Sequence, residues 1–415
     1  MSAPFSTNLR DILQLAPTKS ALTLNGFVSD ILPPIFCYFV TAVLVLIPRT
    51  HWIRLALWPI TVVLALRATS STDFALNDPR QAFWNIDLVL SMFCITTRTL
   101  QWILMKNPPK RIVQDREATP SRNTYDIIKD ALDLMINLRG HDWNWSGGLY
   151  IPPETRPTSS RLRFILATLI SCIIHGLTCG ALHTAVQTFS PDGFATHNGG
   201  TIFDASLPAP VRYLRSSIIS TMTAFAIYSV LRCGYELMAI GGIVVLGQEP
   251  HQWPPAFEKP WISVSLREFW GKRWHQWFRG TFLFLGARPL SYIGGRVGGI
   301  IGAFLASAVF HHTALYVLDE NAKLWNMIVP FAMMGLGMVL ERVYTMVSGR
   351  KVGGWLGWVW TMFWLVLWGN PMVDAWAQAG MMGCSTILDS TGPLRTGVVY
   401  LVKEFDDVLH QYTIQ

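Results

Sequence analysis

Long apolar stretches, each about the length of a membrane crossing, recur along most of the chain. Only a helix satisfies its own backbone polar groups in hydrocarbon, and a crossing takes roughly twenty mostly apolar residues. By this rule about eight stretches are predicted to span a membrane. They run from Ile31 to Ile47, Ile53 to Leu66, Phe83 to Met105, Phe164 to Val186, Ile218 to Leu246, Gly298 to Leu318, Leu324 to Leu340 and Trp355 to Trp368. The sequence therefore predicts an all-α, polytopic transmembrane helical bundle.

The composition supports a membrane protein over a soluble one. Of the 415 residues, 51% are hydrophobic and only 14% are charged, against about one-quarter charged in soluble proteins. The 18 Trp fit the boundary between apolar chains and headgroups, where Trp collects. The net charge of +7 lies mainly between the apolar stretches, so we expect no nucleic-acid partner. The cysteines are scattered and include no CxxC pair, so the sequence does not indicate a zinc knuckle.

The basic residues predict an orientation, because Lys and Arg resist translocation and stay in the cytosol. Three basic loops are each separated by two predicted spans and therefore lie on one side. They contain Lys106, Lys110, Arg111, Arg116, Arg122, Arg139, Arg156 and Arg161; Arg267, Lys272, Arg273, Arg279 and Arg288; and Arg342, Arg350 and Lys351. Gln187 to Pro210 contains no Lys or Arg, so this segment and both termini are predicted to be lumenal. Tyr125 to Leu138 has apolar residues at helical spacing, and it lies either along the membrane surface or on the protein's own cytosolic face.

The stretch from Ser265 to Arg279, SLREFWGKRWHQWFR, combines aromatic and basic residues. Trp270, Trp274 and Trp277 fall at helical spacing among the cations, with His275 between them. Such a stretch can insert its aromatic face at the membrane boundary while its cations stay hydrated. Taken alone, this pattern is that of a simple interfacial anchor.

Two adjacent histidines, His311 and His312, lie inside an apolar stretch that reads SAVFHHTALY. A charged group at that depth is costly, so ionisable residues in spans are rare and usually functional. The apolar surroundings favour a neutral ring, which is the form a general base needs. The alternative is a neutral His that only hydrogen-bonds between helices. For an adjacent pair we favour a functional role.

Together with these two stretches, Asn137 to Gly147 (NLRGHDWNWSG) and Trp253 to Pro260 (WPPAFEKP) make the chain resemble a known family. In order and spacing the motifs are similar to those of the membrane-bound O-acyltransferases, specifically the fungal wax-synthase-like branch, over about the C-terminal two-thirds of the chain. The resemblance implies one integral membrane acyltransferase domain over residues 1–415, with N-terminal spans in 1–110, a cytosolic loop in 111–163 and a catalytic core in 164–415. It also implies the endoplasmic reticulum as the location.

The resemblance assigns the catalytic base to His311 and the second active-site position to His275, where many members of the superfamily have Asn. His312, Trp270 and Trp274 are secondary candidates. The implied reaction uses an acyl-CoA, with acetyl-CoA favoured, as co-substrate and a hydrophobic alcohol as acceptor, with no bound cofactor or metal. His311 would take the hydroxyl proton as the oxygen attacks the thioester, and His275 would stabilise the oxyanion or orient the thiol. Cations for the phosphates of coenzyme A are expected among Arg267, Lys272, Arg273 and Arg279.

Within acyl transfer, the branch implies acetylation of a terpenoid or meroterpenoid secondary metabolite, and the alternative is a long-chain wax or sterol ester synthase. Two other classes of protein remain open. His175, Cys179 and His183 recur every four residues, as metal ligands can, although helix packing is preferred. A proton-coupled transporter would use His311 and His312 as a relay, but few carboxylates, chiefly Glu236 and Glu341, lie in the spans to pair with them.

Overall fold

The computed structural model describes residues 19–113, 116–117, 123–146, 148–385 and 392–411. The chain divides into two compact units. Unit 1 comprises Met1–Leu149 and Trp277–Leu285, and unit 2 comprises Tyr150–Gln276 and Gly286–Gln415. The chain ends, which we predict to be lumenal, lie mostly outside the described residues, as does Arg122. The predicted division of one domain at residues 110 and 163 stays a prediction.

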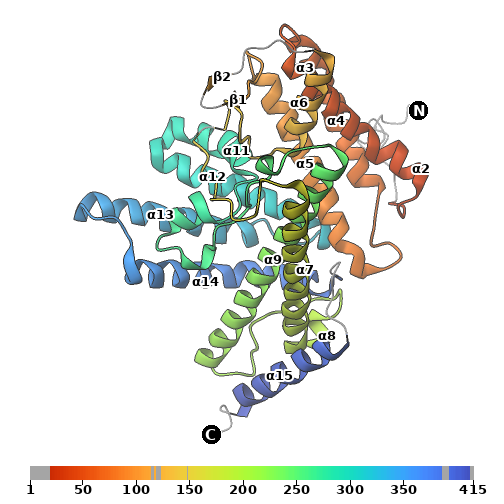
Figure 1. Ribbon diagram of the computed structural model, residues 1–415. Helices are drawn as coiled ribbons and strands as arrows, with labels where there is room; N and C mark the ends of the chain where they lie inside the picture. The colour runs from red at the N-terminus through yellow and green to blue at the C-terminus, as the bar shows by residue number, and fades with distance from the viewer. Residues whose placement is uncertain (1–18, 114–115, 118–122, 147, 386–391, 412–415) are drawn as a thin grey trace, which may run out of the picture. The chain divides into compact units, whose positions relative to one another are not determined.

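Helices dominate both units (Figure 1). Those of unit 1 are α2 (Leu24–Gly26), the π-helix η1 (Phe27–Ile31), α3 (Leu32–Leu46), α4 (His51–Ser71), η2 (Pro79–Gln81), α5 (Ala82–Leu104), α6 (Thr124–Ile136) and α11 (Arg279–Phe282). A two-stranded antiparallel hairpin, β1 (Ile112–Val113) with β2 (Arg116–Glu117), pairs Ile112 with Glu117. The π-helix η6 (Leu283–Ala287) runs from unit 1 into unit 2.

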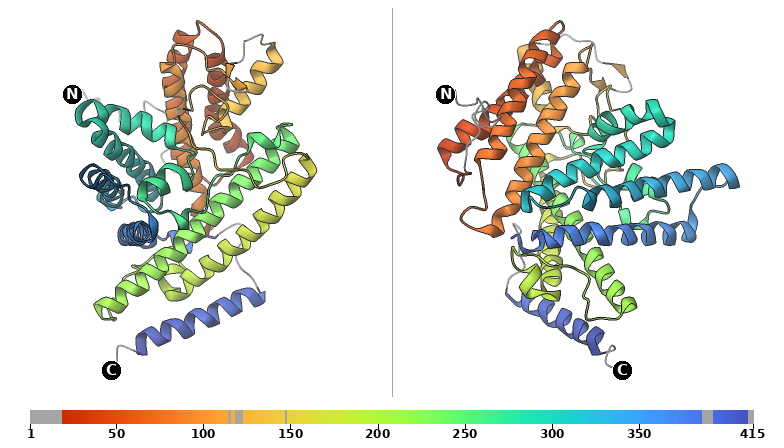
Figure 2. Two further views of the ribbon diagram at one scale, coloured as in Figure 1. Left: turned by 60° about the vertical axis from the view of Figure 1, so that its left-hand side comes forward. Right: turned by 180° about the vertical axis from the view of Figure 1, so that it is seen from behind.

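Unit 2 contains the longest helices. They are α7 (Arg161–Phe189), α8 (Pro191–Phe194), α9 (Ala209–Val245), α10 (Leu266–Glu268), α12 (Arg288–Leu318), α13 (Trp325–Ser348), α14 (Gly354–Gln378) and α15 (Gly392–Gln411), with the short turns η3 (Pro250–Gln252), η4 (Pro260–Ile262), η5 (Phe269–Arg273) and η7 (Met381–Gly383). Figures 1 and 2 show α7 and α9 side by side along most of their length.

Each predicted span coincides with a long helix, which confirms the all-α membrane fold. Within the part of the chain that the structure describes, six helical stretches are long and apolar enough to cross a membrane by length and composition: Leu24–Leu46, His51–Ser71, Arg161–Phe189, Ala209–Val245, Arg279–Leu318 and Trp325–Ser348. The helices α5 (23 residues) and α14 (25 residues) are also long but are not among these six. The count of eight spans therefore stays a prediction.

A pair of glycines folds α12 back on itself. Gly294 and Gly295 are not helical, and Gly295 has a φ of 55°, which favours glycine. A Cβ atom at Gly286 would collide with the carbonyl of Gly302, and one at Gly298 with the carbonyl of Leu290. The segments before and after the glycine pair therefore run antiparallel in close contact. The predicted span from Gly298 to Leu318 is the second arm of this hairpin.

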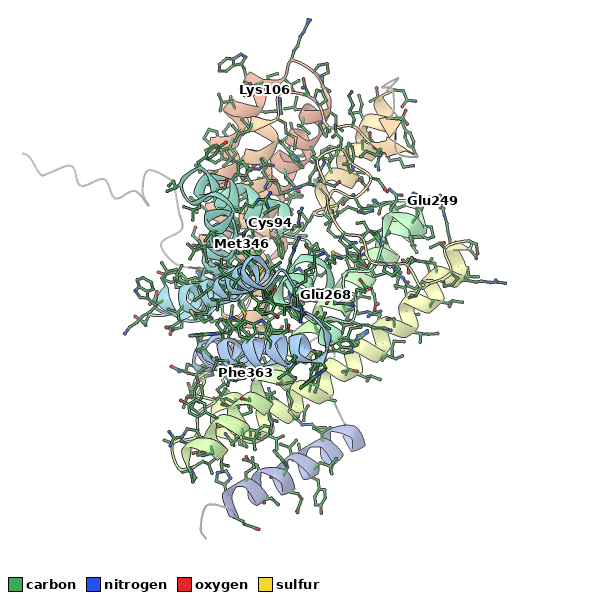
Figure 3. The ribbon with its side chains drawn as sticks, turned by 90° about the vertical axis from the view of Figure 1, so that its left-hand side faces the viewer. Cys94, Lys106, Glu249, Glu268, Met346 and Phe363 are labelled. Atoms are coloured by element: carbon green, nitrogen blue, oxygen red, sulfur yellow. The ribbon has the colours of Figure 1, made fainter. Side chains whose placement is uncertain are left out.

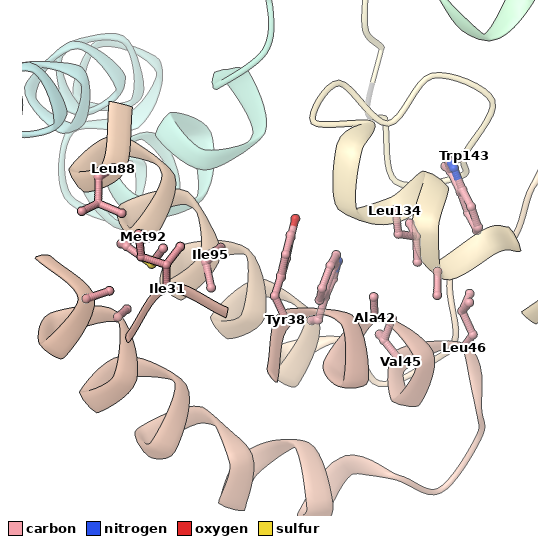
Figure 4. Packing of buried hydrophobic residues seen from close by; sticks show 14 residues of the cluster. Ile31, Tyr38, Ala42, Val45, Leu46, Leu88, Met92, Ile95, Leu134 and Trp143 are labelled. Atoms are coloured by element: carbon pink, nitrogen blue, oxygen red, sulfur yellow. The ribbon is translucent and has the colours of Figure 1, made fainter. Parts of the chain in front are cut away.

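The core of unit 1 packs α3, α5 and α6 around aromatic rings (Figure 4). Tyr38 stacks on Trp102 with ring centroids 4.9 Å apart, and its hydroxyl donates to the carbonyl of Met135 at 3.0 Å. Leu134 and Trp143 are fully buried. The amphipathic segment from Tyr125 to Leu138 thus packs on the protein through α6, and the cytosolic position of this face stays a prediction.

A second core lies in unit 2, where α7, α9, α14 and α15 meet. It contains Phe194, Ile202 and Ala377, all fully buried. The helix α15 is held to it by a buried ion pair between Arg215 and Asp406, with an N–O distance of 2.7 Å. This packing fixes the ends of α7 and α9 that lie nearest Gln187 to Pro210.

Candidate active site

A capped turn starts the SLREFW segment. The Ser265 hydroxyl accepts from the backbone N–H of Glu268 at 3.0 Å, and the Glu268 carboxylate accepts from the N–H of Val264 at 2.9 Å. This is close to the capping box that the pattern S-x-x-E signals, and the sequence reasoning above missed it. The turn continues from α10 into the π-helix η5 and ends at Trp274, whose backbone is extended. Figure 3 labels Glu268 in this turn.

The end of η5 corrects the predicted helical face of tryptophans. Because the helix stops at Arg273, Trp277 does not continue it and belongs to unit 1. Trp274 stacks on Phe269 at 5.4 Å and meets Phe257 edge-on at 5.1 Å. Trp270 packs edge-on against Phe304 of α12 at 5.7 Å. These rings pack against the protein, which favours a positioned site segment over a simple interfacial anchor.

A buried carboxylate on α13 holds the same turn in place. Glu341 accepts from the backbone N–H groups of Leu266 at 2.6 Å and Arg267 at 3.1 Å, and from the indole N–H of Trp360 at 3.1 Å. Only 7% of Glu341 is exposed. Charge-assisted hydrogen bonds to backbone N–H groups are among the stronger ones in proteins. Glu341 therefore links α13 and α14 to the motif, a role that hydropathy alone did not reveal.

The ring of His311 has a defined tautomer. Its Nδ1 lies 2.8 Å from the carbonyl oxygen of Ser307, one turn earlier on α12. Because a carbonyl only accepts, Nδ1 carries the proton, and the neutral ring keeps a lone pair on Nε2. Phe331 of α13 packs against the ring, with centroids 4.6 Å apart. His312 lies beside Tyr316, with centroids 6.3 Å apart.

His275 follows Trp274 directly and lies among aromatic rings in unit 2. Its ring meets Phe257 edge-on at 5.6 Å and is tilted against Trp274 at the same distance. Trp274 contacts Trp270 at 6.2 Å, and Trp270 contacts Phe304, which precedes His311 by two turns of α12. A series of ring contacts thus connects the segment of His275 with the helix of His311.

The four predicted phosphate-binding cations occupy different surroundings. Arg267 and Lys272 are exposed, and Lys272 lies over the ring of Tyr150 at 5.3 Å. Arg273 is mostly buried and contacts two carboxylates, Glu268 at 2.8 Å and Glu258 at 3.7 Å. Arg279 belongs to unit 1. Arg273 is therefore engaged within the protein, whereas Arg267 and Lys272 are open to solvent.

The WPPAFEKP motif contacts Tyr150 and Arg273 through Glu258. The hydroxyl of Tyr150 donates to Glu258 at 2.6 Å, and this hydrogen bond raises the pKa of Tyr150. The N–H of Glu258 donates to the carbonyl of Arg273 at 3.0 Å, while the Arg273 guanidinium donates back to the carbonyl of Glu258 at 3.0 Å. The two motifs are thus joined by both backbone and side-chain bonds.

The NLRGHDWNWSG motif lies in unit 1 and organises its own surroundings. The carboxylate of Asp133 accepts from the indole N–H of Trp143 at 2.8 Å and from the amide of Asn137 at 3.3 Å. The side chain of Arg111 stacks over Trp143 at 4.7 Å and pairs with Asp130 at 2.6 Å. These bonds account for the motif as a folded loop on α6.

Metal ligation finds no support among the residues that the structure describes, where no group of three or more His, Cys, Asp or Glu side chains is placed to hold an ion. Of the three residues spaced by four on α7, His183 bonds through Nε2 to the carbonyl of Met382 at 2.9 Å, and Cys179 is buried. His175 meets Tyr228 edge-on at 5.6 Å. Helix packing and hydrogen bonding occupy this face.

Comparison with known proteins agrees with the motifs. The model of the membrane bound O-acyl transferase family matches residues 253–335, which include His275, His311 and His312. The acetyltransferase ple2 of Rhodocybe pseudopiperita is 25% identical over 343 residues, covering 77% of this chain and 82% of the relative. The acetyltransferase atnC of an Arthrinium species is 32% identical over 62% of this chain and 64% of the relative.

A third relative, the O-Mevalon transferase yanI of Aspergillus niger, is 29% identical over 36% of this chain and 34% of the relative. The matched family is one of acyltransferases rather than transporters, and the long apolar helices supply its membrane setting. These similarities, together with the long apolar helices, support a membrane acyltransferase that resembles the membrane bound O-acyl transferase family over residues 253–335 and is similar to fungal acetyltransferases.

Proposed function

We propose that the chain transfers an acetyl group from acetyl-CoA to a hydroxyl of a hydrophobic terpenoid or meroterpenoid metabolite, at the membrane of the endoplasmic reticulum. The observation that carries this proposal is the ring of His311, whose Nδ1 is occupied by the Ser307 carbonyl at 2.8 Å. Such a ring presents Nε2 as a base without any rearrangement. The names of the relatives ple2 and atnC support acetyl as the group transferred.

In the proposed mechanism, His311 Nε2 takes the proton of the acceptor hydroxyl as the oxygen attacks the thioester carbonyl. The tetrahedral oxyanion then collapses, the C–S bond breaks, and the proton returns to the leaving thiolate. We assign His275 to the oxyanion or the thiol, with His312, Trp270 and Trp274 as secondary site residues. Arg267 and Lys272 are exposed and fit the phosphates of coenzyme A, with Arg273 and Arg279 as further candidates.

A donor comparison tests the proposal. Membranes containing the chain are incubated with labelled acetyl-CoA or palmitoyl-CoA and a panel of terpenoid, sterol and fatty alcohols, and the ester products are identified. We expect label from acetyl-CoA on a terpenoid alcohol. Label from palmitoyl-CoA alone would instead favour the long-chain wax or sterol ester synthase.

A substitution tests the base. His311→Ala should lower the rate of transfer by about 10²–10⁴-fold, the usual contribution of a general base. His251→Ala, an exposed histidine in the loop after α9, is the matched control and should leave the rate unchanged. Wild-type transfer by His311→Ala would show that the base lies elsewhere.

A further inference from the structure

A cluster of polar side chains, which we call the α7–α9 polar cluster, lies inside two of the apolar helices. It consists of Ser171, His175, Tyr228, Arg232 and Glu236. The Ser171 hydroxyl and the Arg232 Nε both donate to Glu236 Oε1, at 2.7 and 3.0 Å. Arg232 Nη1 donates to the hydroxyl of Tyr228 at 2.8 Å. The cluster therefore connects α7 with α9.

Packing alone does not explain these residues. Ionised groups within a span carry a large desolvation cost, and apolar side chains of similar size would join two helices at no such cost. The two helices already meet through small buried residues, since Cys172 and Cys233 approach to 3.2 Å between their sulfur atoms. Ionisable residues within membrane-spanning helices are usually functional, so this ion pair indicates a functional site.

Two atoms of the cluster have unused hydrogen-bonding capacity. Glu236 is 3% exposed, and its second oxygen, Oε2, is buried with no hydrogen-bond partner among the described residues. The same holds for Nδ1 of His175. A buried carboxylate oxygen without a donor is unfavourable, so a ligand that brings an O–H or N–H group would be bound there.

The charge of the cluster narrows the class of ligand. Arg232 and Glu236 neutralise each other in their ion pair, with an N–O distance of 3.0 Å. A neutral site of this kind does not attract a phosphate or a metal cation. A hydroxyl group matches the hydrogen-bonding capacity of these two atoms. It can donate its proton to Glu236 Oε2 and accept a hydrogen bond from a protonated Nδ1 of His175.

One aromatic ring separates the cluster from the catalytic motif. Tyr228 meets Phe257 edge-on with ring centroids 4.8 Å apart. Phe257 in turn meets His275 at 5.6 Å and Trp274 at 5.1 Å. An apolar molecule lying along these rings would have one end at the motif and the other at the cluster.

We propose that the α7–α9 polar cluster binds a second hydroxyl of the acceptor, so that the preferred substrates are apolar diols acetylated at the hydroxyl distant from the cluster. This inference rests on the proposed function for the reaction itself. In it Glu236 and His175 act on specificity: they hold the acceptor and take no part in moving its proton.

A matched pair of acceptors tests the inference. The probes are a rigid polycyclic terpenoid diol and the monool that lacks the hydroxyl which is not acetylated, each assayed with labelled acetyl-CoA and purified full-length chain. Wild type should show a KM about tenfold lower for the diol than for the monool, the difference that one buried hydrogen bond to a charged group gives. The kcat values should be similar.

Two variants then remove the cluster's free atoms. Glu236→Gln replaces the charged carboxylate with a neutral amide, whose oxygen accepts a weaker hydrogen bond. His175→Phe removes Nδ1 while keeping the edge contact to Tyr228. Both should raise the KM for the diol to about that of the monool and leave kinetics on the monool unchanged. A folding defect would lower the activity on both substrates alike, so retained activity on the monool is the control for folding. Glu320→Gln, an exposed carboxylate after α12, is the control and should behave as wild type.

The outcomes separate the two proposals. No acetyl transfer to any alcohol would overturn the proposed function itself. Acetyl transfer with equal KM values for diol and monool in wild type, or a diol preference that survives in both variants, would overturn the assignment of the cluster while leaving the reaction intact.

Discussion

Glu341 shows at the scale of one residue how a buried carboxylate can position a reactive segment. It accepts three hydrogen bonds, two of them from consecutive backbone N–H groups of the SLREFW motif. Replacing it with an apolar side chain would leave these donors buried and unpaired, at a cost of about 1–3 kcal/mol each. We expect Glu341→Leu to lower the temperature of unfolding in detergent and to reduce kcat.

The conservative variant provides the comparison for Glu341. Glu341→Gln keeps one carbonyl oxygen of the same shape, so it should recover part of both the stability and the rate. A rate that is unchanged in Glu341→Leu would mean that the geometry of the motif does not depend on this residue. The measurements are thermal unfolding of the purified chain and acetyl transfer at saturating substrates.

Substitutions of Arg267 and Arg273 should affect different properties of the enzyme, although the two residues are close in sequence. Arg273 is 16% exposed and held by Glu258 and Glu268, so Arg273→Gln should destabilise the fold by leaving two carboxylates without their cation. Arg267 is exposed, so Arg267→Gln should raise the KM for acetyl-CoA with little change in stability. Comparing KM with the unfolding temperature for both variants checks this, and the reverse pattern would contradict the assignment.

At the scale of one element, α15 is attached to the rest of unit 2 by a contact that depends on pH. His410 Nε2 lies 3.2 Å from a carboxylate oxygen of Asp204. The hydrogen bond of His410 to the carbonyl of Asp406, at 2.8 Å, together with the contact to Asp204, raises the pKa of His410 above 6.5. Burial raises the pKa of Asp204, but hydrogen bonds from Ser206 and His410 outweigh it and lower this pKa below 3.8.

The direction of the pH effect follows from these shifts. Because the folded pKa of His410 is raised, its stabilisation is complete below its unfolded value and is lost as pH rises through the folded value. The contribution of Asp204 is lost only when acid lowers the pH through its own depressed pKa. We expect limited proteolysis to release α15 faster at about pH 8 than at about pH 5.5. His410→Ala should abolish this difference, and Asp406, which pairs with Arg215, stays unchanged as the second attachment.

Hydropathy predicted the long elements well, because a helix in hydrocarbon needs only length and apolar residues. It did not predict how α9 keeps Arg232 and Glu236 within a continuous helix of 37 residues, since that depends on their pairing with each other and with Ser171. The hairpin of α12 depends on close backbone approaches at glycine, which hydropathy does not register. Likewise, the position of α10 depends on Glu341, which is distant in sequence, and the burial of Arg273 depends on the carboxylate of Glu258.

The candidate site divides in the same way. The positions of His311 and His275 were named from the resemblance and from the cost of burying an imidazole, and they stay proposals as active-site residues. The ring contacts that connect their segments, from Trp274 through Trp270 to Phe304, are tertiary and were not predictable from spacing. The S-x-x-E pattern at Ser265, in contrast, was readable from sequence alone.

At the scale of the whole molecule, the distribution of Lys and Arg predicts which face meets the cytosol. The segment from Gln187 to Pro210 should be lumenal and the loop after α13 cytosolic. Cysteine substitutions at two exposed positions test this, Asn198→Cys in the first segment and Arg350→Cys in the second. In sealed membrane vesicles with the cytosolic face outward, a membrane-impermeant maleimide should label Arg350→Cys directly and Asn198→Cys only after the vesicles are opened with detergent.

The native thiols favour a clear result in this experiment, because five of the six cysteines are buried and Cys94 is half-buried. Unmodified chain is therefore the background control. Labelling of both variants in sealed vesicles would place both segments on one side. That arrangement would require an even number of crossings between Asn198 and Arg350, where the sequence predicts three, formed by α9, α12 and α13. It would also put in doubt the cytosolic position of the exposed cations Arg267 and Lys272, which coenzyme A requires.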